Sequence, residues 1–68
     1  MMIRLTVNGE KLQQVTARNL QELIETLRLT EKRIAVEVNQ EIIPRSEHQS
    51  TRLREGDRVE IVRAVGGG

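Results

Sequence analysis

The chain has 68 residues, eleven basic and ten acidic side chains, a formal net charge of +1, no cysteine and no aromatic residue. This length allows one domain with a single small aliphatic core. The missing cysteines exclude disulfides, thiolate metal sites and a cysteine nucleophile, while the balanced charge and missing rings argue against nucleic acid or a membrane surface as partner. The N-terminal residues contain no apolar run that predicts a signal peptide or membrane span, so we expect a cytoplasmic protein.

A β-hairpin is the first predicted element. Ile3, Leu5 and Val7 alternate with polar residues, as in a strand with one buried face. The pair Asn8-Gly9 follows, and it tolerates the positive φ angles of a tight hairpin turn. The return strand, over residues 10–15, is mostly polar and therefore typical of an edge strand.

A helix is predicted next, over residues 19–29. Asn19 and Glu22 have the spacing of an N-cap and its reciprocal capping partner. Four aliphatic side chains at helical spacing form one apolar stripe: Leu20, Leu23, Ile24 and Leu27. We expect this stripe to pack on a sheet.

Two further strands follow the helix. Residues 34–38 alternate again, Asn39-Gln40 is a turn signal, and residues 41–43 form a short strand. Pro44 ends that strand because it has no backbone donor.

The stretch 45–54 is predicted to be an irregular polar loop in which Leu53 plugs the core. His48, the single histidine, lies in this loop. A catalytic or metal-binding histidine needs convergent partners, and no spacing here supplies them, so we expect a surface residue.

The last strand is predicted over residues 58–65, with Val59 and Ile61 facing inward. The order hairpin, helix, strand, short strand, loop, strand predicts an α+β protein of the β-grasp type. This fold has a mixed sheet of four to five strands, one helix on one face, and the final strand beside the first in the sheet interior. We assign residues 1–65 to this domain.

Residues 66–68 are expected to form a flexible tail, because Gly66, Gly67 and Gly68 have no side chains to bury. They do not form a phosphate-binding loop, since no helix follows them. A thin tail is suited to entering the active site of another protein. We therefore predict that the α-carboxylate of Gly68 is the working group.

The residues before this tail are candidates for docking a partner. If Val59 and Ile61 face the helix, Val62 and Ala64 lie on the opposite, uncovered face of the sheet, beside Val65. The alternative is a strand covered on both faces, or a local bulge.

Several stretches carry a resemblance to a known family: the opening strand with Asn8-Gly9, the helix over residues 19–29, Val-Glu-Val-Asn-Gln-Glu-Ile-Ile-Pro-Arg at 36–45, and Leu-Arg-Glu-Gly-Asp at 53–57 running to Val-Gly-Gly-Gly at 65–68. The middle segment, 36–45, is the most specific of them. Over its whole length the chain resembles the ThiS family of ubiquitin-like sulfur carriers of thiamine biosynthesis. The related small subunits of molybdopterin synthase share the fold and the diglycine end, but usually lack the middle segment. Gly66 is additional to the family's glycine pair.

The resemblance implies a carrier without catalytic, cofactor or metal sites of its own, monomeric when free. An E1-like adenylyltransferase (ThiF-type) would use ATP and Mg²⁺ to adenylate Gly68. A sulfur donor such as a cysteine desulfurase would then convert it to a thiocarboxylate, which donates sulfur to a thiazole synthase (ThiG-type). The alternatives are a carrier like the molybdopterin-synthase subunit (MoaD-like), serving molybdopterin or another sulfurated product, and a non-catalytic β-grasp binding module.

Overall fold

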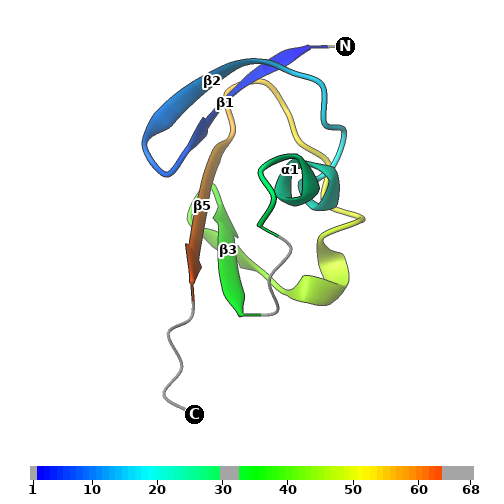
Figure 1. The fold of residues 1–68 in the computed structure, drawn as a ribbon. Helices are drawn as coiled ribbons and strands as arrows, with labels where there is room; N and C mark the ends of the chain where they lie inside the picture. The colour runs from blue at the N-terminus through cyan, green and yellow to red at the C-terminus, as the bar shows by residue number, and fades with distance from the viewer. Residues whose placement is uncertain (1, 30–32, 64–68) are drawn as a thin grey trace.

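The computed structural model describes residues 2–29 and 33–63 (Figure 1). Its elements, in chain order, are β1 (Ile3–Val7), β2 (Glu10–Val15), α1 (Leu20–Thr26), β3 (Ile34–Val38), β4 (Glu41–Ile43), the 3₁₀ helix η1 (Arg45–Glu47) and β5 (Arg58–Arg63). The predicted end of the last strand at residues 64 and 65, and the predicted tail at 66–68, lie outside the described residues.

All five strands belong to one sheet, in the order β2-β1-β5-β3-β4. β1 and β5 are parallel, whereas the other neighbouring strands are antiparallel. The helix α1 lies against one side of this sheet (Figure 1). The predicted α+β architecture is therefore confirmed, with the final strand beside the first in the sheet interior.

Two tight turns have the left-handed backbone that their asparagines suggest. Asn8 and Gly9 have φ angles of 51° and 81°, and they join β1 to β2. Asn39 and Gln40 have φ angles of 53° and 70°, and they join β3 to β4. Asparagine tolerates this region better than other residues with a Cβ, so both hairpins form at the predicted positions.

The N-terminus of α1 is capped by side chains. The Oδ1 of Asn19 accepts a hydrogen bond from the N–H of Glu22 at 2.8 Å. The Glu22 carboxylate accepts from the N–H of Arg18 at 2.8 Å, one residue before the position expected for a capping box. The N-cap prediction is thus confirmed, with a displaced reciprocal bond.

The helix ends earlier than the sequence suggests, at Thr26 rather than near residue 29. Arg28 has a φ of 59°, which the helix cannot continue through. The N–H of Arg28 donates to Glu25 O at 3.0 Å and that of Leu29 to Ile24 O at 2.9 Å. These two bonds form a Schellman motif, which normally carries glycine at the position of Arg28.

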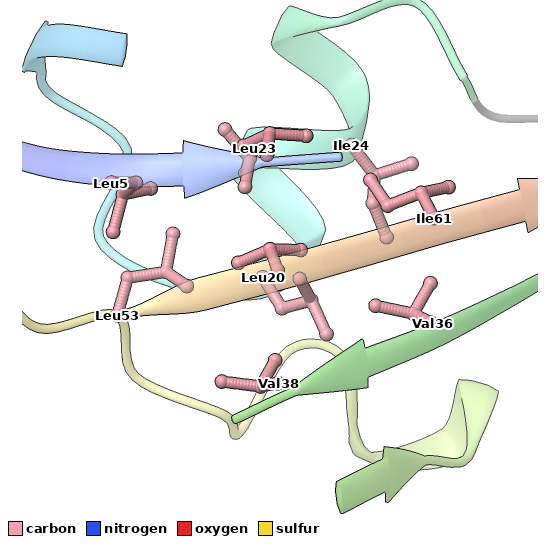
Figure 2. Packing of buried hydrophobic residues seen from close by; sticks show 10 residues of the cluster. Leu5, Leu20, Leu23, Ile24, Val36, Val38, Leu53 and Ile61 are labelled. Atoms are coloured by element: carbon pink, nitrogen blue, oxygen red, sulfur yellow. The ribbon is translucent and has the colours of Figure 1, made fainter. Parts of the chain in front are cut away.

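The core between α1 and the sheet is aliphatic (Figure 2). Ten described hydrophobic residues are buried: Leu5, Val7, Leu20, Leu23, Ile24, Val36, Val38, Leu53, Val59 and Ile61. Leu53 enters this core from the loop before β5, as predicted. In the described part of the chain no helix has the length and apolar character needed to cross a membrane.

The loop that leads into β5 is locked onto β1. The Glu55 carboxylate accepts from the backbone N–H of Arg4 at 2.9 Å and from its Nε at 2.6 Å. The N–H of Gly56 donates to Arg4 O at 2.8 Å, and that of Thr6 to Asp57 O at 3.0 Å. The backbone N–H of Arg4 and then its guanidinium lower the pKa of the Glu55 carboxyl below its ordinary value.

We predict that Glu55→Gln weakens the fold only where Glu55 is ionised. The unfolded chain has a glutamate pKa of about 4.3, and the folded value is lower, so folding releases protons between the two values. The stabilisation is therefore complete above about pH 4.3 and is lost as the pH falls through the folded pKa. Urea unfolding of wild type and variant across pH 2–7 measures this difference.

The matched control for this experiment is Glu41→Gln in the edge strand β4, which leaves the Arg4–Glu55 pair intact. Its pH profile should parallel that of the wild type. A constant stability difference between wild type and Glu55→Gln at every pH would contradict the assignment.

Candidate functional site at the end of β5

The last residues of β5 alternate between the core and the uncovered face of the sheet. Val59 and Ile61 are 1% and 6% exposed, whereas Val62 is 59% exposed. Of the two alternatives from the sequence, the structure thus places Val62 on the uncovered face. Its role in docking stays a prediction.

Val62 belongs to a small surface on that face, which we call the outer patch. Its apolar members are Val62, its cross-strand partner Ala35, and Ile42 on β4, which is 72% exposed. Its acidic members are Glu37 and Glu60, which pair across β3 and β5. Glu37 is also opposite Ile42 across β3 and β4, so the carboxylates lie beside the apolar side chains.

Two like charges directly opposite each other destabilise a sheet unless something neutralises them. Glu60 is exposed and Glu37 half-buried on the uncovered face. Arg58 lies on the same face of β5, two residues before Glu60, so the chain itself offers a cation beside this pair. The outer patch thus combines exposed apolar side chains with charged ones.

The other residues singled out in the sequence follow directly after β5. Ala64, Val65, Gly66, Gly67 and Gly68 lie outside the described residues. The predictions for these five positions therefore remain predictions. The structure does describe β5, the strand that these five residues follow in the sequence.

The expectation that His48 lies on the surface is wrong. Its side chain is 4% exposed, and its Nε2 lies 3.2 Å from the carbonyl oxygen of Ile43. Since a carbonyl can only accept, Nε2 carries the proton in this contact. The carbonyl of His48 accepts from the N–H of Gln21 at 3.1 Å, so this residue joins β4 to α1.

The burial of His48 has a structural cause. The 3₁₀ helix η1 turns the loop inward, and the His48 N–H donates to Arg45 O at 3.1 Å. Among the described residues there is no group of three or more His, Cys, Asp or Glu side chains that could hold a metal ion. We interpret His48 as a packing residue.

Residues 3–68 of the chain match the model of the ThiS family. The chain belongs to the ThiS family. A crystal structure of the thiamine biosynthesis protein ThiS from Geobacter metallireducens is 33% identical, with a TM-score of 0.83, and the match covers 97% of this chain and 100% of that one. The resemblance noted in the sequence is therefore confirmed.

Two relatives extend the comparison of this ThiS-family chain. An uncharacterized protein, ycf40, of Porphyra purpurea is 36% identical over 66 residues, which cover 97% of this chain and 93% of that protein. A thiazole synthase of Paramagnetospirillum magneticum is 33% identical over 66 residues. The match covers 97% of this chain but 20% of the thiazole synthase, so most of that protein has no counterpart here.

Of the outer patch, only Val62 was singled out from the sequence; Ala35, Glu37, Glu60 and Ile42 were missed, and Ile42 is the most exposed apolar residue among them. Ile42 and Ile43 are adjacent and equally apolar, so composition alone does not say which one faces outward. The strand period was the available signal, since Ile43 pairs with the buried Val36 and its neighbour must face the other way.

We predict that His48→Ala lowers the free energy of unfolding by about 2–4 kcal/mol, because it leaves a cavity and a carbonyl without its donor. Urea unfolding measures the change. The matched control is Gln49→Ala at the exposed neighbouring position, which should change stability by less than about 0.5 kcal/mol. Equal effects at the two positions would show that His48 has no packing role.

Proposed function

We propose that this chain is a sulfur carrier in thiamine biosynthesis and that its reactive group is the terminal carboxylate of Gly68. Membership of the ThiS family and the likeness to a ThiS protein of known structure support this role. The observation that carries the proposal is the position of β5. This strand is held between β1 and β3 and leads directly into residues 64–68.

The proposed chemistry starts from the poor electrophilicity of a carboxylate. The oxygen of Gly68 attacks the α-phosphorus of ATP on an E1-like adenylating enzyme, pyrophosphate leaves, and an acyl-adenylate forms. The terminal sulfur of a persulfide then attacks the carbonyl carbon and AMP leaves with the original oxygen, giving an acyl disulfide. A thiol supplies the two electrons that cleave the S–S bond, which releases the thiocarboxylate.

Gly66 and Gly67 are proposed to serve as the thin approach to Gly68. A side chain on either residue would have to fit the channel through which the terminus reaches the nucleotide. In this division, residues 1–65 are the folded body and residues 66–68 the tail that is handled by partners. The chain supplies the acyl group, and its partners supply the catalysts, the ATP and the Mg²⁺, so it is not itself an enzyme.

A thiazole synthase is the proposed acceptor of the sulfur. The supporting observation is a relative named thiazole synthase that contains a region similar to nearly all of this chain. Thiazole formation needs sulfur at the enzyme that builds the ring, and a carrier brings it there as an activated thioacid. We place this cycle in the cytoplasm, with a cysteine desulfurase as the sulfur donor.

The outer patch is proposed as the docking surface for the adenylating partner, together with Ala64 and Val65. Val62 and Ile42 offer apolar contact, and Glu37 and Glu60 offer charged groups beside it. Docking there sets the partner beside the strand that leads to Gly68. A partner bound in this way is well placed to receive the terminus.

The first prediction of this proposal is a covalent change at Gly68. After incubation with ATP, Mg²⁺, the adenylating enzyme and a sulfur donor, a thiol-alkylating reagent should label the protein at Gly68, as located by peptide mass spectrometry. Alkylation is required because exchange of oxygen for sulfur has nearly the mass of methionine oxidation. Gly67→Val should fold normally and remain unlabelled.

The positive control for labelling is the ThiS protein of Geobacter metallireducens treated in parallel. If that protein is labelled and Gly68 is not, the sulfur-carrier proposal is refuted for this chain. Circular dichroism of Gly67→Val confirms that a loss of labelling arises at the tail.

The second prediction concerns docking. Val62→Asp puts a third carboxylate beside Glu37 and Glu60 and removes an apolar contact, so the KM for adenylation should rise about tenfold or more. The control is Gln49→Asp, which makes the same change of charge at an exposed position outside the patch. Equal KM values for the two variants would remove the outer patch from the interface.

A further inference from the structure

β5 extends further than the strand beside it. Its parallel pairing with β1 comprises Thr6 with Arg58 and Val7 with Val59. On its other side, β3 accompanies β5 as far as Arg63. The ladder with β1 closes with the bond from the Asn8 N–H to Val59 O at 2.9 Å, and there the chain turns away into β2.

A side chain takes the place that the next residue of β1 would have had. The N–H of Ile61 donates to the Oδ1 of Asn8 at 2.8 Å, and the Nδ2 of Asn8 donates to Ile61 O at 3.1 Å. One amide thus supplies the donor and the acceptor that a strand would supply. The two residues are 53 positions apart, and both bonds are partly buried.

Few residues other than asparagine could make this pair of bonds from position 8. The backbone there has a φ of 51°, which asparagine and glycine tolerate best. Glycine would keep the turn but has no amide. Aspartate has the right length but, when ionised, accepts at both oxygens and cannot donate to Ile61 O.

We propose that Asn8 is a positioning residue, which extends the support of β5 past the end of β1 and so holds the last residues of this strand in place. Ile61 lies two residues before the end of β5. The two hydrogen bonds between the Asn8 side chain and Ile61, which we call the clamp, order the strand that residues 64–68 follow in the sequence. This inference rests on the proposed function, because its value is to present a terminus to a partner.

The chain contains a matched control at the other end of β5. Asn39 also lies in a turn, with a φ of 53°. Its Oδ1 accepts from the Arg58 N–H at 3.0 Å, and its Nδ2 donates to the Asp57 carboxylate at 2.9 Å. Asn8→Gly and Asn39→Gly therefore remove similar bonds from the two ends of one strand while keeping the positive φ accessible.

The first measurement is amide hydrogen exchange by NMR on the full chain. Asn8→Gly should speed exchange of the Ile61 amide about tenfold relative to that of the Arg58 amide. Asn39→Gly should instead speed exchange of the Arg58 amide relative to that of the Ile61 amide. This readout needs no partner protein. Wild-type protection of Ile61 in Asn8→Gly would overturn the clamp, whatever the function of the chain.

The second measurement is steady-state adenylation with the E1-like enzyme. Asn8→Gly should raise the KM for the carrier about three- to tenfold with kcat within about twofold, because the end of β5, which residues 64–68 follow in the sequence, is held less firmly. Asn39→Gly should leave both constants near the wild-type values. Equal KM changes in the two variants would reduce Asn8 to a stability role and overturn the inference.

Failure of the proposed function is distinguishable from failure of this inference. If the wild-type chain is never adenylated, the carrier proposal falls, and the exchange experiment still decides the clamp. A second variant, Asn8→Asp, keeps the acceptor for Ile61 N–H and loses the donor. Its KM should lie between those of wild type and Asn8→Gly, and a wild-type KM would contradict a clamp of two bonds.

Discussion

The parallel pairing of β1 with β5 is the constraint on which the rest of the structure depends. It brings together strands from opposite ends of the described chain. Parallel neighbours cannot be joined by a tight turn, so the chain between them has to cross over, and α1 covers one face of the sheet on the way. β3 and β4 then complete the far side. The last strand thereby becomes the central one.

Several polar side-chain contacts act on this same strand and on the turn before it. The core is aliphatic and small, in a chain of a length at which burial barely outweighs chain entropy. Glu55 fixes the turn before β5 to β1, Asn39 holds its first residue, and Asn8 holds Ile61. These bonds act on β5 and the turn before it, where the backbone ladder with β1 is short, so they supplement a modest core at the central strand.

The sequence was a good guide wherever the signal is local. Strand alternation, Asn-Gly at the first hairpin and the Asn19 cap depend on neighbouring residues, and all three are confirmed. The errors arise where distant contacts decide. His48 has polar neighbours in the sequence but is buried against Ile43 and bonded through its backbone to α1. The early helix end was missed because an arginine occupies the left-handed position that glycine usually marks.

The early end of β1 reconciles two requirements of the proposed site. A strand held firmly in a sheet needs neighbours on both sides, whereas a segment that enters another protein needs room around it. A longer β1 would satisfy the first requirement. It would also bring the turn between β1 and β2 closer to the end of β5, against the second requirement. Instead β1 stops beside Val59, and one asparagine side chain supports Ile61 in its place. A contact of two hydrogen bonds from one short side chain is smaller than a strand, so β5 gains support while little bulk is added near its end.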